Sequence, residues 1–257
     1  MRTRTVLITG STSGIGLGIA HAFAAKGYNI LFNGVEKNGG EIAAGVAERY
    51  QIRHLFSGAD ARSPQALREM VQQCVATFGS VDVLVNNAGI QHVSPVEDFP
   101  DDKWDDIIAI NLSAAFHLAK AVWPVMKSQQ FGRIINIASI HGLFASAFKS
   151  AYVAAKHGIV GLTKTLALEG APFNITCNAI CPGYVHTPLV EKQVQDQARA
   201  HNMSEERVMT EVFLAKQAVK SFIPMETVCA MVMLLAEDEP GTITGTALPL
   251  DGGWSAQ

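Results

Sequence analysis

The sequence predicts an α/β protein built on a doubly wound parallel sheet. Short apolar runs alternate along the chain with segments of ten or more residues that have helical spacing, which is typical of parallel βαβ units. The apolar runs lack a strict alternation of polar and apolar residues, as expected when helices cover both faces of a sheet. Because such crossovers are right-handed, the helices divide between the two faces, and ligands bind at the carboxyl ends of the strands.

The elements follow one another in a regular order. Residues 5–9 (TVLIT) form an apolar run that leads directly into a glycine turn, and helical spacing follows at 14–26. Ser63 and Pro64 open a later helix, because serine caps helix N-termini and proline suits the first turn. The expected strands are 5–9, 29–32, 53–56, 81–85, 133–138, 174–180 and 247–250. The expected helices are 14–26, 36–50, one that begins at 63–64, 101–128, 150–169 and 227–236.

Length and composition favour a single domain over residues 1–257. Of the 257 residues, 48% are hydrophobic and 17% are charged, and the formal net charge is −3. A charged share below the usual value of about 25% excludes a disordered chain, and the charge gives no sign of a nucleic-acid surface. The long apolar stretches are interrupted well before about 18 residues, and no secretory leader is visible. We therefore expect a cytoplasmic protein without a membrane span.

The four cysteines, Cys74, Cys177, Cys181 and Cys229, are expected to be reduced and buried, as is usual in the cytoplasm. The spacing of Cys177 and Cys181 would suit two metal ligands on a helix, but their segment has the apolar character of a buried strand. No His and Cys cluster has zinc spacing, and no catalytic metal is expected. The last residues, 254–257, could pack at a subunit interface, or the C-terminal carboxylate could bind a hard cation.

One segment, residues 186–222, does not fit the alternation. It is polar and charged, has weak helical periodicity and lies between two core elements at the ligand edge of the sheet. A long excursion at this edge is a candidate lid over a substrate site. The alternative is a helical surface insertion with a structural role only.

A glycine-rich turn, residues 9–16 (TGSTSGIG), joins the first strand to the first helix. Glycines let the backbone turn sharply and let a pyrophosphate approach, while the helix N-terminus offers free N–H groups. The spacing is G-x-x-x-G-x-G, and the strand before it and the helix after it are the context that a dinucleotide site requires.

Residues after the next three strands bear on the cofactor. Glu36 could bind the ribose hydroxyls of NAD, although Lys37 is adjacent, and no arginine that would favour NADP lies in the glycine turn or directly after the second strand. NAD is therefore expected. Asp60 could accept a hydrogen bond from the adenine amino group or be a surface aspartate. Residues 86–89 (NNAG) could let the backbone approach the cofactor while the asparagines hold neighbouring loops, or could form a plain turn.

Tyr152 and Lys156 lie one turn apart on the helix expected at 150–169 and therefore share a face. A nearby ammonium group favours a phenolate and lowers the tyrosine pKa from about 10, which would suit a general base. Ser139, at the end of the fifth strand, could donate a hydrogen bond to a substrate oxygen as charge develops there. Asn111 lies within the long helical region at 101–128.

These motifs, in this order, resemble those of the short-chain dehydrogenase/reductase family over essentially the whole chain. The matching pieces are TGSTSGIG at 9–16, NNAG at 86–89, Asn111, Ser139, Tyr152 with Lys156, and PGYVHT at 182–187. The resemblance implies a Rossmann-type domain, a homotetramer and a catalytic tetrad of Asn111, Ser139, Tyr152 and Lys156.

The resemblance also implies a role for each site residue. Tyr152 is the acid/base, Lys156 lowers its pKa and holds the nicotinamide ribose, Ser139 orients the substrate oxygen, and Asn111 supports a water chain to Lys156. Thr187 contacts the carboxamide of the cofactor. The implied cofactor contacts are Gly10, Thr12, Gly14, Ile15, Gly16, Asp60, Asn87, Ala88, Gly89, Lys156, Pro182, Gly183, Val185 and Thr187.

Within the family, the chain is similar to the D-3-hydroxybutyrate dehydrogenases. The pieces that carry this similarity are GIQHV at 89–93, SIHG at 139–142, Lys149, TPLVEKQ at 187–193 and GWSAQ at 253–257. They imply a carboxylate site of Gln91, His141, Lys149 and Gln193. A short 3-hydroxy acid has one charge and few atoms, so its binding depends on charge-assisted hydrogen bonds. Tyr184 stands where this group often has tryptophan, which puts the packing against the substrate methyl in doubt.

The activity expected from this similarity is the NAD-dependent interconversion of (R)-3-hydroxybutyrate and acetoacetate. An alternative is a reductase of 3-oxoacyl thioesters or of another small carbonyl, which would require a basic NADP selector and a surface for a carrier domain. Neither is evident in the sequence. A non-catalytic dinucleotide-binding regulator would be expected to lack a member of the tetrad, and all four are present. The expected partners are a small 3-hydroxy acid and further copies of the chain, without nucleic acid or membrane.

Overall fold

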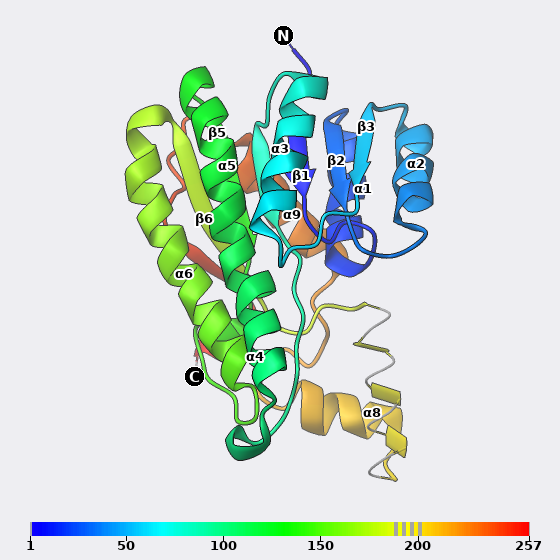
Figure 1. Ribbon diagram of the computed structural model, residues 1–257. Helices are drawn as coiled ribbons and strands as arrows, with labels where there is room; N and C mark the ends of the chain where they lie inside the picture. The colour runs from blue at the N-terminus through cyan, green and yellow to red at the C-terminus, as the bar shows by residue number, and fades with distance from the viewer. Residues whose placement is uncertain (1, 188–189, 192–193, 196–197, 200–201, 257) are drawn as a thin grey trace.

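Seven parallel strands form one sheet in the computed structural model, which describes residues 2–187, 190–191, 194–195, 198–199 and 202–256 (Figure 1). The strands are β1 (Thr5–Ile8), β2 (Asn29–Asn33), β3 (His54–Ser57), β4 (Val83–Asn86), β5 (Gly132–Ile137), β6 (Ile175–Pro182) and β7 (Ala247–Leu250). Their order is β3-β2-β1-β4-β5-β6-β7, and every neighbouring pair is parallel. The winding therefore reverses between β1 and β4, where doubly wound sheets bind their ligands.

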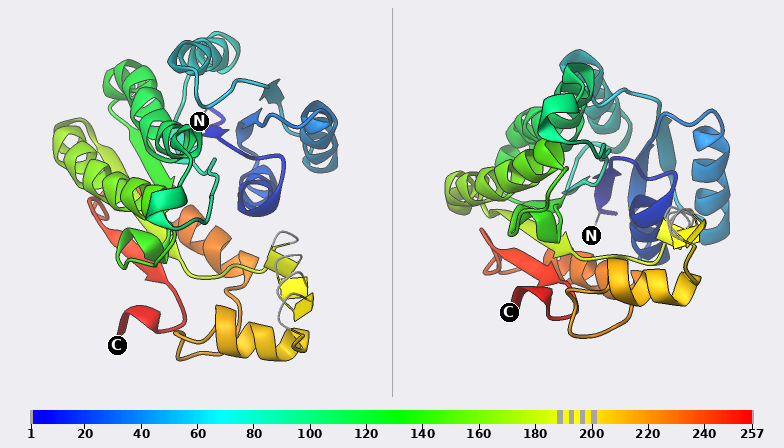
Figure 2. Two further views of the ribbon diagram at one scale, coloured as in Figure 1. Left: turned by 60° about the horizontal axis from the view of Figure 1, so that its bottom comes forward. Right: turned by 90° about the horizontal axis from the view of Figure 1, so that it is seen from below.

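Helices cover both faces of this sheet. The longer helices are α1 (Gly14–Ala25), α2 (Gly39–Tyr50), α3 (Pro64–Phe78), α4 (Asp101–Ile108), α5 (Ala114–Gln129), α6 (Ser150–Gly170) and α9 (Met225–Glu237). Residues of α1, α2 and α9 pack on one face, and residues of α3, α5 and α6 pack on the other. Figure 2 shows this division from the end of the sheet, with α5 and α6 in green opposite α9 in orange. The doubly wound α/β fold predicted from the sequence is confirmed.

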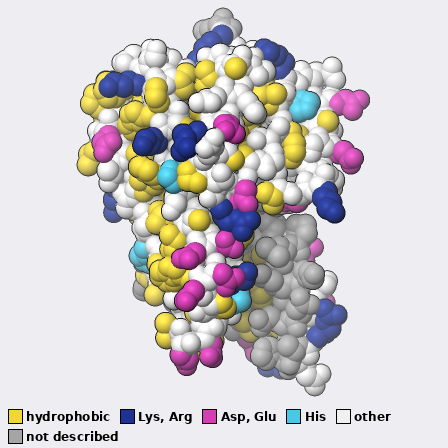
Figure 3. Space-filling view, in the orientation of Figure 1, with side chains coloured by type: hydrophobic (Ala, Val, Ile, Leu, Met, Phe, Trp, Pro, Cys, Tyr) yellow, Lys and Arg dark blue, Asp and Glu magenta, His cyan; other side chains and the backbone are white. Residues whose placement is uncertain are grey.

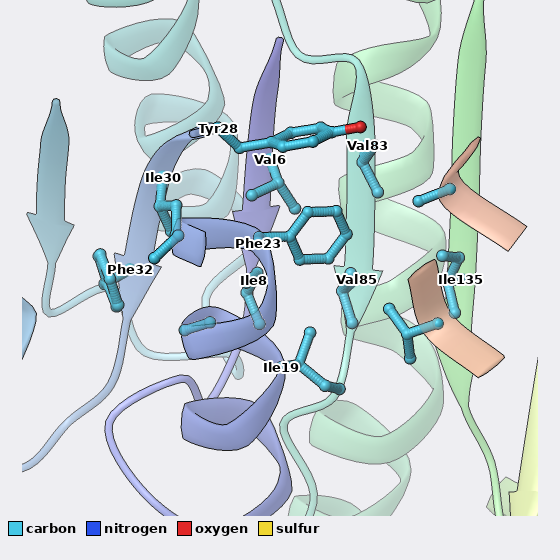
Figure 4. Packing of buried hydrophobic residues seen from close by; sticks show 14 of the residues in the cluster. Val6, Ile8, Ile19, Phe23, Tyr28, Ile30, Phe32, Val83, Val85 and Ile135 are labelled. Carbon is cyan, nitrogen blue, oxygen red and sulfur yellow. The ribbon is translucent and has the colours of Figure 1, made fainter. Parts of the chain in front are cut away.

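The core consists of two hydrophobic layers that share the strands. Val6 and Ile8 of β1 point toward α1, where Ile19 and Phe23 pack with them (Figure 4). Leu7, between them in the sequence, points to the opposite layer with residues of α3, α5 and α6. Because successive strand residues face opposite sides of a sheet, strands covered on both faces are apolar throughout, as the sequence pattern indicated.

Most elements begin and end within two residues of their expected positions. Helix α2 is the exception, because it begins at Gly39 rather than near residue 36. The carboxylate of Glu36 accepts hydrogen bonds from the hydroxyls of Thr12 and Ser13, which holds this residue in the loop. Ser63 caps α3 as predicted, and its hydroxyl accepts a hydrogen bond from the Ala66 N–H.

The helical region expected at 101–128 contains an irregular turn. A π-helical turn, η2 (Ala109–Ser113), joins α4 to α5 and includes Asn111. The combined segment, residues 101–129, is long and apolar enough to cross a membrane by length and composition, whereas the sequence analysis expected no such stretch. Core helices of globular proteins pass the same test, and α5 buries Leu118, Val122 and Met126 against the sheet.

The four cysteines are free thiols, as expected. Cys177 and Cys181 lie on strand β6 rather than on a helix, and burial raises the pKa of Cys177 to about 12. Cys229 corrects the expectation of four buried side chains, because it is partly exposed. Its neighbour Val228 is on the buried stripe of α9, and at 3.6 residues per turn the next side chain lies at the edge of that stripe.

A chain of polar side chains crosses the buried centre of the sheet. Asn86, at the end of β4, donates a hydrogen bond of 2.8 Å to Oδ1 of Asn136 in β5. Asn136 in turn donates to Oγ1 of Thr163 on α6, also at 2.8 Å. Asn136 is fully buried, so these hydrogen bonds replace those that water would provide. The chain connects the ends of two central strands to the helix that carries Tyr152 and Lys156.

We expect Asn136→Ala to lower the free energy of unfolding by about 2 kcal/mol, because the buried Asn86 amide then loses its acceptor. Urea denaturation followed by circular dichroism measures this change. Asn38→Ala is the matched control, since Asn38 is exposed and caps α2 without a side-chain hydrogen bond; its effect should stay within about 0.5 kcal/mol. Equal stability of the two variants would contradict a structural role for the buried polar chain.

Candidate active site

The predicted site residues gather at the carboxyl ends of the central strands, at the lower end of the sheet in Figure 1. Two adjoining cavities of about 550 and 590 Å³ lie there and share Ile15, Asn87, Gly89 and Thr187 among their walls. The first contains Tyr152 and is called the tyrosine cavity below. The second lies over the glycine turn and the ends of β2 and β3, and is called the glycine-turn cavity.

The glycine turn is shaped to admit a phosphate group. Gly10 has φ +60°, a left-handed conformation that glycine adopts without strain. A Cβ on Gly16 would lie 2.1 Å from the carbonyl oxygen of Gly10, so a glycine is required for the first turn of α1 to pack this closely. The N-terminus of α1 therefore reaches the cavity with its free N–H groups, an arrangement that fits the pyrophosphate of a dinucleotide.

Two side chains fix the glycine turn to the loop after β4. Oγ1 of Thr9 accepts hydrogen bonds from the N–H groups of Asn87 (2.9 Å) and Ala88 (3.0 Å). Nδ2 of Asn87 donates to the carbonyl oxygens of Thr9 (2.9 Å) and Gly10 (3.0 Å). The expectation that an asparagine of this loop holds a neighbouring loop is confirmed. Thr9 was not among the predicted contacts, although its place directly before the first glycine of the turn was a usable signal.

Glu36 gives one end of the glycine-turn cavity a negative charge. It lines this cavity and accepts hydrogen bonds from Oγ1 of Thr12 at 2.5 Å and from Oγ of Ser13 at 3.4 Å. The hydrogen bond from Thr12 lowers the pKa of the Glu36 carboxyl. Thr12, a predicted cofactor contact, is buried and thus acts from behind Glu36 rather than as part of the cavity wall.

Asp60 and Arg62 form a charged group in the same cavity. Nη2 of Arg62 lies 2.6 Å from Oδ2 of Asp60, and Nη1 lies 3.3 Å from Oδ1 of Asp106 on α4. The hydrogen bonds from Arg62 hold the pKa of Asp60 below its ordinary value. Asp60 lines the cavity, as its predicted role requires. Arg62 was not among the predicted site residues, because a single arginine in a loop belongs to no spacing pattern.

Tyr152 and Lys156 lie in the first two turns of α6 and both line the tyrosine cavity. Lys156 is buried, and its Nζ donates a hydrogen bond of 2.8 Å to the carbonyl oxygen of Ile137, the last residue of β5. Its Nζ lies 5.6 Å from the centre of the Tyr152 ring. Burial lowers the pKa of Lys156 to about 8, so its ammonium group begins to lose its proton near neutral pH.

The electrostatics of Tyr152 differ from the expectation. Burial raises the pKa of Tyr152 from its ordinary value of 10.0, and a hydrogen bond with Ser139 opposes this effect. The expectation that Lys156 lowers the Tyr152 pKa is wrong for this structure, because desolvation is the largest influence and the ammonium donates to a backbone carbonyl instead. Of the two groups, Lys156 therefore loses its proton at the lower pH.

His141 connects the serine to the predicted carboxylate site. Ser139 caps the short helix η3 (Ile140–Gly142), and its Oγ accepts a hydrogen bond of 3.1 Å from the His141 N–H. Nδ1 of His141 lies 3.4 Å from the carbonyl oxygen of Phe144, and Nε2 lies 3.4 Å from Nζ of Lys149. A neutral ring protonated on Nδ1 satisfies both contacts. Burial, together with the Lys149 charge, favours this form and lowers the pKa of His141 to about 4.

The described walls of the tyrosine cavity contain basic groups and no Asp or Glu. Lys149 and Lys156 both line it, and Gln91 contributes an amide from the loop after β4. None of the ion pairs among the described residues involves Lys149, and burial lowers its pKa. A half-buried cation without a counter-charge favours an anionic ligand. Gln193, the fourth predicted carboxylate contact, lies outside the described residues.

Asn111 uses its side chain to hold the loop that carries Gln91. Its Nδ2 donates to the Ile90 carbonyl oxygen and its Oδ1 accepts from the Ile90 N–H, both at 2.9 Å. Asn111 and Lys156 also line one small void of about 10 Å³, which is close to the space of a single water. Since both side-chain groups of Asn111 bind Ile90, the expected water chain would have to use the Asn111 backbone.

The structure brings most of the predicted residues together. Those that line the tyrosine cavity are Ile15, Asn87, Gly89, Gln91, Ser139, His141, Lys149, Tyr152, Lys156, Pro182, Gly183, Val185 and Thr187. Those that line the glycine-turn cavity are Gly10, Gly14, Ile15, Asp60, Asn87, Ala88, Gly89 and Thr187. Gly16 and Asn111 act from behind these walls, through the contacts described above.

Trp254 is a residue near the site that the sequence analysis did not place there. The Trp254 ring meets the His141 ring edge-on, with 5.7 Å between the ring centres. Nζ of Lys216 lies 5.3 Å from the centre of the Trp254 ring. A subunit interface or a cation site was expected at this end of the chain. Gln257, whose carboxylate would bind the cation, lies outside the described residues.

Comparison with known proteins identifies relatives along the whole chain. The sequence matches the profile of the short chain dehydrogenase family over residues 4–198. It is 51% identical over 260 residues to D-beta-hydroxybutyrate dehydrogenase of Rhizobium meliloti (strain 1021), covering 99% of this chain and 100% of that protein. It is 49% identical over 258 residues to D-beta-hydroxybutyrate dehydrogenase of Cupriavidus necator, covering 99% and 98%. A solved structure described as a short-chain alcohol dehydrogenase from Sinorhizobium meliloti 1021 is similar with a TM-score of 0.88 at 31% identity, covering 100% of this chain and 98% of that one.

We expect Trp254→Ala to raise the pKa of His141 from about 4 toward its ordinary value of 6.5, because water then reaches a ring that burial keeps neutral. An NMR titration of the imidazole measures this pKa. Trp104→Ala removes a partly exposed tryptophan of α4 and should leave the value unchanged. If the two variants gave the same His141 pKa as the parent, the ring would owe its burial to groups other than Trp254.

Proposed function

The chain belongs to the short-chain dehydrogenase family, and on this basis we propose that it interconverts (R)-3-hydroxybutyrate and acetoacetate, with NAD as its cofactor. The observation that carries the proposal is the tyrosine cavity, whose described walls combine Tyr152 with Lys149 and no acidic group. Such a cavity suits a small substrate that has both a carbinol and a carboxylate. The names of the relatives from R. meliloti and C. necator support the same substrate.

Tyr152 exchanges a proton with the substrate oxygen on C3. Burial raises its pKa, so the phenol is protonated at neutral pH and can donate to the ketone oxygen of acetoacetate. The residues of the glycine-turn cavity would hold NAD, which would supply the acceptor for the hydride of C3 in the oxidative direction. Above about pH 8, where Lys156 loses its proton, the Tyr152 and Lys156 pair holds one proton fewer and can accept the proton of the substrate hydroxyl.

Ser139 orients the substrate oxygen beside Tyr152. Its Oγ accepts the hydrogen bond of the His141 N–H, which fixes the position of the oxygen, and its hydroxyl is in hydrogen-bond contact with Tyr152, where the substrate oxygen would bind. A donor held in this way stabilises the negative charge that develops on the substrate oxygen.

Lys149 provides the positive charge for the substrate carboxylate, with Gln91, His141 and Gln193 beside it. Nε2 of His141 accepts a hydrogen bond from the Lys149 ammonium and so holds it toward the cavity. Lys149 lies three residues before Tyr152, a separation that suits a carboxylate two carbons from the reacting carbon. A 3-oxoacyl thioester lacks this carboxylate and would leave the cation without a partner, which disfavours the alternative reductase.

We place residues 186–222 as a lid within a single domain that spans residues 1–257. In its described part, α8 (Glu205–Val208) and η5 (Met209–Phe213) contribute to a small hydrophobic cluster of their own. This cluster meets the cavity wall where Phe213 packs edge-on against Tyr184, with 5.0 Å between the ring centres. A separate cluster can move as a unit, and its closure would exclude water and strengthen the charge interactions inside.

The charges of the glycine-turn cavity support NAD rather than NADP. Glu36 has a lowered pKa and is ionised at neutral pH, so it can accept hydrogen bonds from ribose hydroxyls and would repel a 2′-phosphate. Arg62 is the basic side chain of this cavity, and its guanidinium is already paired with Asp60 and Asp106. The glycine turn, which lines the same cavity, would hold the pyrophosphate.

The proposal includes a homotetramer in the cytoplasm. The four free thiols suit a reducing compartment. Trp104, Phe116 and Leu168 expose apolar surface on α4, α5 and α6, and hydrophobic side chains lie among acidic ones over this part of the molecule in Figure 3. Exposed apolar surface of this kind supports contact with further copies of the chain, and light scattering would give the mass of the assembly.

We expect Lys149→Met to raise the KM for (R)-3-hydroxybutyrate by about 10- to 100-fold, because it removes a charge-assisted hydrogen bond to the carboxylate. Initial rates of NADH formation measure KM and kcat. Lys26→Met is the matched control, since Lys26 is exposed at the end of α1, and its kinetics should be those of the parent. A parent-like KM in Lys149→Met would overturn the carboxylate site and with it the substrate.

We expect Glu36→Gln to reduce the preference for NAD over NADP by about tenfold or more, because it removes the charge that repels the 2′-phosphate. The ratio of kcat/KM for the two cofactors measures the preference. Glu41→Gln changes an exposed glutamate on α2 and should leave the ratio unchanged. Efficient use of NADP by the parent protein would contradict the proposal that NAD is the cofactor.

A further inference from the structure

We propose that Phe148 is a positioning residue, whose left-handed backbone conformation aims Lys149 and sets its distance from Gln91. Phe148 has φ +65°, a region that residues other than glycine, asparagine and aspartate rarely adopt. The inference rests on the proposed function, because it concerns how the two carboxylate contacts are held relative to one another.

Phe148 differs from the other non-glycine residues with positive φ. These are Gln51, Gln130, Asn174 and Asn202 among the described residues. Gln51, Gln130 and Asn174 follow the last residues of helices, where a left-handed residue is the usual way to end a helix. Phe148 instead precedes a helix and has an aromatic side chain that is 59% exposed. Side-chain packing therefore offers little to offset the strained backbone, which points to a role for the backbone itself.

The backbone at Phe148 joins the two loops that carry the carboxylate contacts. The Phe148 carbonyl oxygen accepts a hydrogen bond of 2.9 Å from the Ser94 N–H. The loop after β4 is thereby held on both sides of Gln91, at Ile90 by Asn111 and at Ser94 by Phe148. Gln91 cannot shift along the cavity wall without breaking one of these attachments.

The same residue determines the direction of Lys149. Lys149 follows Phe148 and is the N-cap of α6, with φ −126° and ψ 37° and no side-chain cap. A change of Phe148 from the left-handed region to the extended region would redirect the next Cα–Cβ bond and move Nζ of Lys149 from its place 3.4 Å from His141. Because α6 continues directly to Tyr152, the junction also sets how the Lys149 ammonium lies relative to the Tyr152 hydroxyl. One backbone conformation thus holds the two ends of the substrate site in register.

A graded series at residue 148 tests the inference. Asparagine tolerates the left-handed region, alanine has the same Cβ as the parent phenylalanine and therefore about the same steric cost there, and β-branched valine has the largest cost. We expect the KM for (R)-3-hydroxybutyrate to stay within about twofold in Phe148→Asn and in Phe148→Ala, and to rise by about tenfold in Phe148→Val. The Kd for NADH should be unchanged in all three, because neither Phe148 nor Lys149 is among the described residues that line the glycine-turn cavity. The melting temperature should be highest in Phe148→Asn, about 2 °C above the parent, close to the parent value in Phe148→Ala and lowest in Phe148→Val.

A double-mutant cycle with Gln91→Ala gives a second readout. If Phe148 sets the distance between Gln91 and Lys149, Phe148→Val should raise KM less in the Gln91→Ala protein than in the parent. Equal KM increases in Phe148→Asn and Phe148→Val would overturn the inference, because they would assign the effect to the side chain. Parent-like KM in Phe148→Val would overturn it as well. Both results leave the proposed function standing as long as Lys149→Met raises KM, whereas a parent-like KM in Lys149→Met would remove the proposed function itself.

Discussion

The site depends on the hydrogen bonds between Thr9 and Asn87. Strands β1 and β4 pair in the sheet, but the chains that leave them turn to opposite faces, toward α1 and toward α4. The side chains of Thr9 and Asn87 span this division with four hydrogen bonds to backbone groups. They keep the glycine turn at a fixed separation from the loop that continues to Gln91. Both cavities are built outward from this point, so the cofactor residues and the substrate residues share one attachment to the sheet.

The two cavities differ in how their charged side chains are satisfied. In the glycine-turn cavity, Arg62 is paired with carboxylates, so little positive charge is left for a ligand. In the tyrosine cavity, Lys156 is held by a backbone carbonyl and Lys149 by a neutral histidine. Neutral acceptors fix the direction of an ammonium group without cancelling its charge. This difference between the two cavities supports the proposal of a cofactor without a 2′-phosphate beside an anionic substrate.

The fold and the main site could be predicted from the sequence because both follow from short-range patterns. Apolar runs separated by helical spacing predict the sheet, and the site motifs lie at strand ends that any doubly wound sheet brings together. The pKa of Tyr152 could not be predicted, because it depends on burial by residues distant in the sequence. Arg62 and Trp254 were missed for a similar reason. Their partners, Asp106 and His141, are 44 and 113 residues away (106 − 62 and 254 − 141), and no local pattern links them.

The π-helical turn that includes Asn111 has a consequence for how the chain length can vary. A π turn adds one residue to an α-helix, so the helix before it is rotated by about 100° relative to the helix after it. Here this rotation lets α4 contact α6 while α5 packs against α3 and the sheet. Deleting one residue would restore a regular helix, but it would turn Asp106 away from Arg62 and Asn111 away from Ile90. Even a one-residue insertion or deletion in this segment would therefore disturb the site. The loops at the amino ends of the strands lie away from both cavities and can change in length without reaching them.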